Sequence, residues 1–347
     1  MRVTSVSSAL IFKLNQLGDN VVFLPALQRL VSENTFESLT LWTTPLAAPL
    51  YRNLPIKLHT ISRDDFYPAW KKPSLLLALC RKIRKTKPDL VLVAEDMGNT
   101  AYFLALVSGA ARRIGTRPPY LKIPFAINEP VLLDPATPEP EKAWRLVGAL
   151  AEAGGSAPWT GTPPPPSLSH LDHAQADSLD ILIHAGASRE YKRWPIARFH
   201  ELAGRLARDF RVGWCMAPNA PPPPNPAVRP IAPGRLDDLV SQIAKASLFV
   251  GNNSGPMNLA SALGTPSVIF IGPSPRSWDP YWHRDRFRIL RKDSLPCIAC
   301  GAGTWPQQDA CTNLSAPVAC MTLWSVDEAE AEIRSWHARH IAPKPAR

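Results

Sequence analysis

Short apolar runs alternate along the chain with longer segments whose apolar residues recur at helical spacing. In the first half, strand-like runs lie at residues 9–14, 39–42 and 90–94, and helical patterns lie at 21–31 and 99–111. In the second half, strand-like runs at 179–184, 212–216, 248–251 and 267–271 alternate with helical patterns at 196–209, 236–246 and 257–263. Strands separated by helices of this length predict parallel sheets with helices on both faces. The pattern therefore predicts an α/β protein with two Rossmann-like domains.

Proline marks the predicted domain junction. The chain has 347 residues, enough for two domains. Proline accounts for 38 of them, about 11% of the chain against a usual ~5%. A run of four prolines at 163–166 follows a Gly-Gly-Ser stretch, so we expect domains at 1–165 and 166–347. A second run at 221–224 predicts an extended surface loop. Because proline lacks an amide hydrogen, we expect the prolines to lie outside helices and central strands.

Composition narrows the class of protein. Apolar residues make up 45% of the chain and charged residues 20%, as in globular proteins. The apolar runs are all shorter than the roughly 18 to 20 residues that cross a bilayer. The N-terminal apolar stretch runs into Lys13 and Asp19 without a small-residue cleavage site, which favours a buried strand over a signal peptide. Cys80 and Cys215 stand alone in apolar segments, unlike the cysteines of secreted disulfide-framed proteins. We therefore expect a cytoplasmic protein.

The net charge of +10 favours an anionic partner. Basic residues gather at 81–87, at the end of a leucine-rich helix, and at Arg284, Arg286 and Arg288, which alternate as on a strand. One interpretation is helix-end cations and a solvated strand face. The other is contact with anionic headgroups or a phosphorylated acceptor. RNA-binding aromatic motifs and zinc-finger spacing are missing from the sequence, so nucleic acid is not an expected partner.

The turns that follow the strands are the first places to search, because ligands of doubly wound sheets bind at the carboxyl ends of strands. The turn at 14–20 carries Gly18 and Asp19 at the start of a helix. Glycine permits a sharp turn, and a carboxylate is favoured at a helix N-terminus. Asp19 is therefore either a helix cap or a general base.

The second turn, at 184–195, places small residues after a strand, which lets a phosphate approach the backbone. Lys192 then either delivers a point charge to that phosphate or is a solvated loop residue. His184, at the strand end, is interpreted as a structural histidine rather than a catalyst.

The third turn, at 249–258, carries Ser254 and Gly255 at the start of a helix. The free amides of that helix predict an anion site for a pyrophosphate, and an ordinary capped helix is the alternative. The turn at 272–275 follows the next strand and is expected at the same sheet edge.

Four late cysteines, Cys297, Cys300, Cys311 and Cys320, have the spacing C-x2-C-x10-C-x8-C. Such thiols suit a structural zinc or iron ion. Free buried cysteines are the alternative, because the second C-x2-C knuckle of a zinc ribbon is missing from the sequence.

Taken together, the LGDNVVFLPAL segment, the GASREYKRWP turn, the NNSGPMNLASALGTPSVIFIGPSPRSWDP block and the trailing cysteines resemble glycosyltransferase family 9, the ADP-heptose:lipopolysaccharide heptosyltransferases. The resemblance runs from about residue 10 to residue 320 in the family's order. It implies a GT-B fold, in which two Rossmann-like domains face each other across a cleft, the first binding the acceptor and the second the nucleotide-sugar. It also implies inverting transfer without a required metal, and iron at the cysteines, as in the branch that heptosylates autotransporter adhesins.

The resemblance also implies residue roles. Asp19 matches the family's proposed base, and Lys13 and Gly18 belong to the acceptor side, with Lys13 where many members have arginine. Lys192 matches the lysine that contacts donor phosphate. The other donor-binding residues implied are Ala187, Ser188, Asn253, Ser254, Gly255 and Asn258. Two of these depart from the family, which usually has aspartate and histidine at positions 253 and 258, although asparagine keeps the capacity to form hydrogen bonds.

The expected function is that of an inverting glycosyltransferase that moves a heptose from ADP-heptose to a lipopolysaccharide-core or related glycan acceptor. We expect it in the cytoplasm or at the inner face of the inner membrane, against an anionic glycan or glycolipid. The alternatives are a relative that uses another nucleotide-sugar or a protein acceptor, and a noncatalytic nucleotide- or glycan-binding protein. An oxidoreductase is disfavoured because the first strand is not followed by G-x-G-x-x-G.

Overall fold

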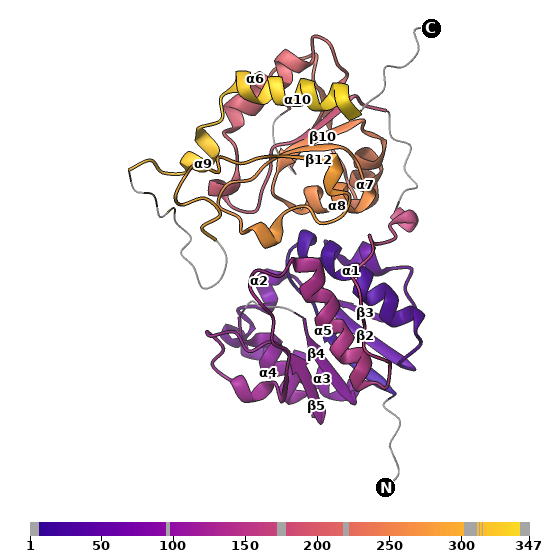
Figure 1. Cartoon of the computed structure of the whole chain (residues 1–347). Helices are drawn as coiled ribbons and strands as arrows, with labels where there is room; N and C mark the ends of the chain where they lie inside the picture. Colours follow the sequence, from indigo (N-terminus) through magenta and orange to yellow (C-terminus); the bar gives the residue numbers. More distant parts are fainter. Residues whose placement is uncertain are drawn as a thin grey trace. The chain divides into compact units, whose positions relative to one another are not determined.

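The computed structural model describes residues 7–94, 98–171, 178–217, 222–301, 311, 313 and 315–340. The chain divides into two compact units, residues 1–166 and 167–347 (Figure 1). Each unit contains one six-stranded sheet. Every pairing between described strands is parallel.

Unit 1 has the strand order β3-β2-β1-β4-β5-β6. Its strands are β1 (Ser8–Phe12), β2 (Ser38–Thr43), β3 (Lys57–Thr60), β4 (Leu90–Val93), β5 (Arg112–Gly115) and β6 (Glu129–Pro130). Its helices are α1 (Leu17–Ser32), α2 (Arg63–Phe66), α3 (Pro73–Thr86), α4 (Thr100–Val107) and α5 (Glu139–Ala153), with short 3-10 turns η1 (Ala48–Tyr51), η2 (Ala69–Lys71) and η3 (Pro124–Ala126).

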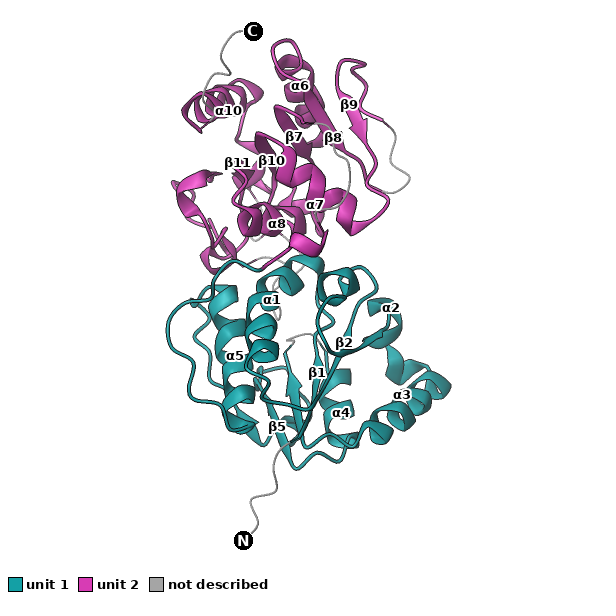
Figure 2. Ribbon diagram, turned by 90° about the vertical axis from the view of Figure 1, so that its right-hand side faces the viewer, with its two compact units in different colours: residues 1–166 teal, residues 167–347 magenta. Residues whose placement is uncertain are grey.

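Two layers of helices cover the unit 1 sheet. Figure 2 shows α1 and α5 on one side of the strands and α3 and α4 on the other. On the second side, Leu10 and Val91 of the central strands pack with Leu79 and Ile83 of α3 and with Tyr102 of α4. The central strands are apolar on both faces because both faces are covered, as the continuous apolar runs of the sequence predict.

Unit 2 has the strand order β12-β11-β10-β7-β8-β9. Its strands are β7 (Ile181–His184), β8 (Val212–Cys215), β9 (Arg229–Ile231), β10 (Leu248–Asn252), β11 (Ser267–Phe270) and β12 (Phe287–Leu290). Its helices are α6 (Ile196–Leu206), α7 (Leu236–Lys245), α8 (Gly255–Leu263), α9 (Ala319–Thr322) and α10 (Val326–His340), with 3-10 turns η4 (Ser169–Leu171), η5 (Glu190–Lys192), η6 (Arg276–Trp278) and η7 (Arg284–Arg286).

The two units share one topology. Numbered along the chain within each unit, both sheets have the order 3-2-1-4-5-6, which is that of the dinucleotide-binding Rossmann fold. The order reverses between β1 and β4 in unit 1 and between β7 and β10 in unit 2. The prediction of an α/β chain with two Rossmann-like domains is therefore confirmed, and each unit has a topological switch point where ligands of such folds bind.

An aromatic cluster holds the first helix of unit 2 against its sheet. The Trp194 ring stacks on Phe270 of β11 with centroids 4.4 Å apart and planes 9° apart, and it meets Phe199 of α6 edge-on at 4.9 Å. All three side chains are fully buried. Such offset and edge contacts add to the large apolar area that each ring buries. The cluster fixes the chain at the point where the β7–α6 loop enters its helix.

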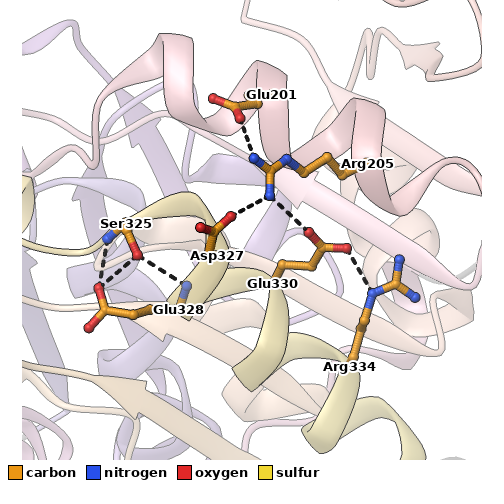
Figure 3. A network of polar contacts seen from close by, with 7 residues as sticks. All are labelled: Glu201, Arg205, Ser325, Asp327, Glu328, Glu330 and Arg334. Atoms are coloured by element: carbon orange, nitrogen blue, oxygen red, sulfur yellow. Dashed lines mark hydrogen bonds and ion pairs between the residues drawn. The ribbon is translucent and has the colours of Figure 1, made fainter.

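Salt bridges fasten α10 to α6, the helix that the aromatic cluster holds against the sheet. The Arg205 guanidinium contacts Glu201 on its own helix and both Asp327 and Glu330 on α10, and Arg334 contacts Glu330 in turn (Figure 3). Half-exposed pairs of this kind contribute little singly, and a shared network holds orientation better than one pair. Ser325 and Glu328 cap the start of α10 by exchanging hydrogen bonds of 2.8 to 3.1 Å.

The structure corrects three expectations. Pro25 lies inside α1 and is buried, so one proline does occupy a helix interior. The helix expected at 99–111 ends at Val107, and residues 112–115 form β5. The three alternating arginines do not share a strand, because 284–286 form η7 and only Arg288 lies on β12. Pro222 to Pro224 lie outside helices and strands, and Pro221 falls outside the described residues.

Candidate active site

The switch point of unit 2 is built around one buried side chain, Asn252, at the end of β10. Its Nδ2 donates to the Ala185 carbonyl at 2.8 Å, and its Oδ1 accepts from the Trp194 amide at 2.9 Å. These two residues are the beginning and the end of the β7–α6 loop. Asn252 thus pins both ends of the loop that was expected to bind donor phosphate. No role for Asn252 is predicted from the sequence.

The pinned loop carries Lys192, whose side chain is only 5% exposed. Its Nζ lies 4.3 Å from the centroid of the Trp278 ring, a cation–π distance. The Ala187 carbonyl accepts two hydrogen bonds from the Arg193 guanidinium at 2.7 and 3.0 Å, which closes the loop on itself. Ser188 is exposed. Lys192 is therefore not the solvated loop residue of the alternative interpretation, because it is buried and its ammonium group lies over the Trp278 ring.

The β10–α8 turn brings the N-terminus of α8 to the same edge of the sheet. Ser254 is the N-cap residue, and its Oγ is buried with no hydrogen-bond partner among the described residues. Gly255 and Pro256 begin the helix, and Asn258 lies one turn further along and is partly exposed. A helix start without a side-chain cap leaves amides available to an anion.

Trp278 links this turn to the loop that follows β11. The Nδ2 of Asn253 donates to the Trp278 carbonyl at 2.9 Å, while Lys192 lies over the ring of the same residue. The neighbouring Asp279 forms a double ion pair with Arg291, whose side chain is 4% exposed. Trp278 and Arg291 were not among the predicted site residues. The Trp-Asp-Pro triplet at 278–280 is the only local signal for them in the sequence, and a triplet of this composition does not by itself predict a site.

Asn253 is suited to its place because it is an amide. A carboxylate at this position has no hydrogen to donate to the Trp278 carbonyl. Asparagine, which stands here in place of the family's usual aspartate, thus has a hydrogen-bond acceptor in this chain. The bond holds the start of α8 to the loop that follows β11.

His184 lies beneath the β7–α6 loop. Burial lowers the pKa of its imidazole to about 4, with a smaller contribution from the Arg193 charge. Its Nδ1 is buried and has no partner among the described residues. A Cβ on Gly186 would stand 2.9 Å from its Cε1, so the loop packs closely on the ring. The imidazole is neutral at pH 7, in line with a structural role.

Asp19 lies at the start of α1 in unit 1. Its Oδ2 accepts a hydrogen bond from the Gln16 amide at 2.9 Å, which is the capping geometry of the alternative interpretation. The carboxylate is partly exposed, and Gly18 lies inside the first helical turn rather than at a sharp bend. Burial raises the pKa of Tyr51 well above its usual value, and the Asp19 charge raises it further. The cap leaves the carboxylate at the switch-point end of the helix.

Lys13 closes the switch point of unit 1. Its side chain is 8% exposed, and its Nζ donates to Asn15 Oδ1 at 3.0 Å and to the Ala94 carbonyl at 2.9 Å. The second bond joins the ends of β1 and β4, the two strands between which the order reverses. The structure thus gathers Lys13, Gly18 and Asp19 at one strand edge of unit 1, and the donor-side residues at one strand edge of unit 2.

The four late cysteines line one cavity in unit 2, together with Tyr191 and Pro273. The Val318 amide donates to Cys311 Sγ at 3.3 Å, and burial, followed by the three other thiols, raises the pKa of Cys320 to about 11. Within the described ranges, the His, Cys, Asp and Glu side chains form no group that could hold a metal ion. The structure brings the predicted cysteines together but does not arrange them as metal ligands.

Two features indicate the class of protein: a pair of 3-2-1-4-5-6 sheets in two units, and a buried lysine in the loop that follows the first strand of the second sheet. Two such sheets are the architecture of a GT-B type glycosyltransferase. The family model of glycosyltransferase family 9 (heptosyltransferase) matches residues 76–302, and the chain belongs to this family.

Solved structures confirm the fold over nearly the whole chain. The E. coli heptosyltransferase WaaC, solved with ADP-2-deoxy-2-fluoro heptose, is 17% identical with a TM-score of 0.68, covering 94% of this chain and 99% of that one. E. coli ADP-heptose lps heptosyltransferase II is 18% identical with a TM-score of 0.65, covering 96% and 100%. The iron-containing dodecameric glycosyltransferase TibC of enterotoxigenic E. coli is 17% identical with a TM-score of 0.58, covering 96% and 77%.

A curated relative is lipopolysaccharide heptosyltransferase 1 of Campylobacter coli. It is 27% identical over 124 residues, which are 31% of this chain and 36% of the relative. The match thus spans about a third of that relative's length. Among the described residues, no helix is both long enough and apolar enough to span a membrane.

Proposed function

We propose that the protein is an inverting glycosyltransferase that moves a heptose from ADP-heptose to a lipopolysaccharide-core or related glycan acceptor. Family membership supports heptosyl transfer, and ADP-heptose and lipopolysaccharide appear in the names of the relatives. In this proposal unit 2 binds the donor and unit 1 supplies the acceptor side.

The observation that carries the proposal is the buried Lys192 at the switch point of unit 2. Breaking the bond between the sugar and the diphosphate leaves growing negative charge on ADP. A preorganised ammonium group and the free amides at the start of α8 stabilise that charge in the transition state. Lys192 therefore acts on the leaving diphosphate, and no metal ion is required for this task.

The remaining donor contacts follow from the same edge of the sheet. The amides of Ser254 and Gly255 and the Ser254 hydroxyl bind diphosphate oxygens, because that hydroxyl has no partner among the described residues. Asn253 holds the turn through the Trp278 carbonyl, and Asn258 offers an amide one turn along α8. Ala187 and Ser188 line the phosphate loop.

Asp19 is the proposed base. It removes the proton of the acceptor hydroxyl as that oxygen attacks the anomeric carbon, and inversion follows from a single displacement. The N-terminus of α1 favours its charged form. Gly18 and Lys13 shape the acceptor side, where Lys13 keeps the turn in place through Ala94.

The test is turnover by the purified chain with a panel of nucleotide-sugars and saccharide acceptors, followed as nucleotide release. We expect release with ADP-heptose and a loss of about 10²-fold or more for Asp19→Asn, since a positioned base contributes 10²–10⁴-fold. Asp64→Asn, on an exposed carboxylate of α2, is the matched control. Full activity of Asp19→Asn would refute the base, and binding without turnover for every pair would identify a noncatalytic binding protein.

The acceptor is an anionic glycan or glycolipid, and the enzyme works at the inner face of the inner membrane. The net charge of +10 supports this part of the proposal. Comparison of phosphorylated and dephosphorylated acceptors tests it. A lower KM for the phosphorylated form is expected, whereas equal KM values would contradict the anionic acceptor.

A second proposal concerns the cysteine cavity. We propose that Cys297, Cys300, Cys311 and Cys320, which line this one cavity, close around a structural iron or zinc ion when the metal binds, because four cysteine thiolates are a typical ligand set of both. Metal analysis of purified protein is expected to find about one ion per chain, lost in Cys297→Ser and kept in the control Cys80→Ser. Protein free of both metals would refute it.

A further inference from the structure

One surface of unit 1 combines exposed apolar side chains with exposed cations. Trp70 on η2 is 67% exposed and Leu77 on α3 is 50% exposed. Figure 2 shows α3 at the outer edge of unit 1, alongside α4. The surface, called here the α3 face, consists of Trp70, Lys71, Leu77, Arg81, Arg84 and Lys85. Large exposed apolar side chains that gather with a charged rim mark an interaction site.

Helix geometry gathers these side chains on one face. Leu79 and Ile83 point into the core, and Leu75 and Leu76 are half-buried. At 100° per residue, Arg81 and Arg84 lie within about 40° of Leu77 on the helix wheel, and Lys85 within about 80°. The outward face of α3 is therefore a leucine bordered by three cations, with Trp70 and Lys71 just before its first turn.

The charge of the α3 face is uncompensated. The sequence between Asp65 and Asp89 contains no acidic residue. Lys72 is paired with Asp65 at 2.7 Å, but Arg81, Arg84 and Lys85 form no ion pair within the described part of the chain. Cations at a helix C-terminus are favoured by the helix dipole, which accounts for Arg84 and Lys85. The dipole does not account for an exposed tryptophan and leucine beside them.

We propose that the α3 face docks on the surface of an anionic lipid bilayer. Tryptophan is favoured at the membrane interface, leucine inserts among the acyl chains, and lysine and arginine contact anionic headgroups. A protein partner of matching acidity and a nucleic acid are the competing occupants. The bilayer fits better because it satisfies the apolar and the cationic side chains together.

The proposal rests on the membrane location given under the proposed function and specifies its surface. Vesicle binding is measured without donor or acceptor, so failure of vesicle binding and failure of transfer are separate results. Each cation near an anionic surface contributes about 1 kcal/mol, so removal of three is expected to lower the partition coefficient by about 100-fold. Binding is expected to weaken with salt, because the Debye length shortens to about 3 Å at 1 M.

The experiment is co-sedimentation of the full chain with vesicles of phosphatidylcholine alone or with phosphatidylglycerol. Wild type is expected to bind only the anionic vesicles. The triple variant Arg81→Gln, Arg84→Gln and Lys85→Gln should lose binding by about 100-fold, and Trp70→Ser with Leu77→Ser should lose it while keeping the charge. The matched control changes Lys57, Arg145 and Arg208 to Gln and removes the same charge from other exposed positions.

Several outcomes would overturn the proposal. Equal losses in the triple variant and its control would show a general charge effect. Binding only to vesicles that contain lipopolysaccharide would assign the face to the saccharide, and binding of RNA without vesicle binding would assign it to nucleic acid. Thermal unfolding of each variant shows whether it is folded, and nucleotide release from soluble donor and acceptor is expected to remain at the wild-type level.

Discussion

The two switch points have the same strand order, but different buried polar side chains join their strand ends. In unit 1 the crevice between β1 and β4 is closed by Lys13, whose ammonium group is bonded to the Ala94 carbonyl and to Asn15. In unit 2 the crevice between β7 and β10 is closed by the neutral amide of Asn252. Around Asn252, the Ser254 hydroxyl and the His184 Nδ1 are buried without partners among the described residues.

This difference indicates where each unit keeps capacity for a ligand. A buried polar atom without a partner costs free energy, and native proteins keep few of them. Unit 1 uses its buried cation within the fold, and its carboxylate caps α1. Unit 2 uses its buried amide within the fold and leaves the Ser254 hydroxyl and the start of α8 without side-chain partners among the described residues. One topology thus supports two different switch points, one whose buried cation is hydrogen-bonded within the fold and one that keeps a buried hydroxyl without a partner among the described residues.

The largest expected effect is on transfer, from Lys192→Gln. Loss of the ammonium group removes a stabiliser of the leaving diphosphate, so kcat is expected to fall by about 10²- to 10³-fold. Steady-state kinetics with varied donor measures it. Lys245→Gln, on an exposed lysine of unit 2, is expected to keep wild-type kcat. A change confined to KM would show that Lys192 binds the ground state and the transition state equally.

Replacement of the closing amide is expected to affect stability. Asn252→Ala leaves the Ala185 carbonyl and the Trp194 amide unpaired in the interior, which costs about 2 to 4 kcal/mol of unfolding free energy. Asn252→Asp keeps the acceptor for Trp194 but sets a buried carboxylate oxygen against the Ala185 carbonyl, which is also destabilising. Urea denaturation should therefore rank wild type above both variants, with exposed Asn53→Ala as control. Equal stabilities would disprove the pinning role.

The corresponding change in unit 1 is Lys13→Met, which keeps the aliphatic stem. The Ala94 carbonyl loses its partner, and a loss of about 1 to 3 kcal/mol is expected in the same denaturation assay. Lys13→Arg keeps the cation and should recover most of the loss. If Lys13→Met is as stable as wild type, the cation is not a structural part of this crevice.

The smallest expected effect is a pH dependence of stability from His184. Burial lowers the folded-state pKa to about 4, whereas an unfolded histidine titrates near ~6.5. Between these values the unfolded state binds more protons, so stability is full above about pH 6.5 and falls as the pH drops toward 4. The loss from pH 7.5 to 5 is expected to be about 1 to 2 kcal/mol. His184→Gln should remove that slope, and a slope unchanged by the substitution would assign it to other groups.

The prediction of the fold was best for the central strands. Strands β1, β4, β7, β10 and β11 are apolar runs because both faces of the sheet are covered there. The strands that the pattern missed lie toward the sheet edges, where polar side chains are tolerated. In β5, Arg112 is bonded to Glu129 and to the Ala153 carbonyl, so a strand that begins with two arginines is stable in its context. Such compensation is invisible in the sequence of one segment.

The candidate site divides in the same way. The positions of Lys192, Ser254 and Asp19 at strand-to-helix turns followed from the alternation of elements and from family resemblance. The roles of Asn252, Trp278 and Arg291 did not, because each depends on partners far away in the sequence. Asn253 departs from the family pattern, and the physical reason lies in the tertiary structure, where its side-chain amide donates a hydrogen bond to the Trp278 carbonyl.

The sequence by itself determined the two parallel sheets, the family and the positions of the strand-to-helix turns, because apolar periodicity and short motifs are local properties of the chain. The tertiary structure decided which polar side chains are hydrogen-bonded within the fold and which are buried without a partner among the described residues. Burial and hydrogen-bond partners arise only when distant strands meet, and they separate the buried Lys13, bonded to Ala94, from the unpartnered Ser254 hydroxyl.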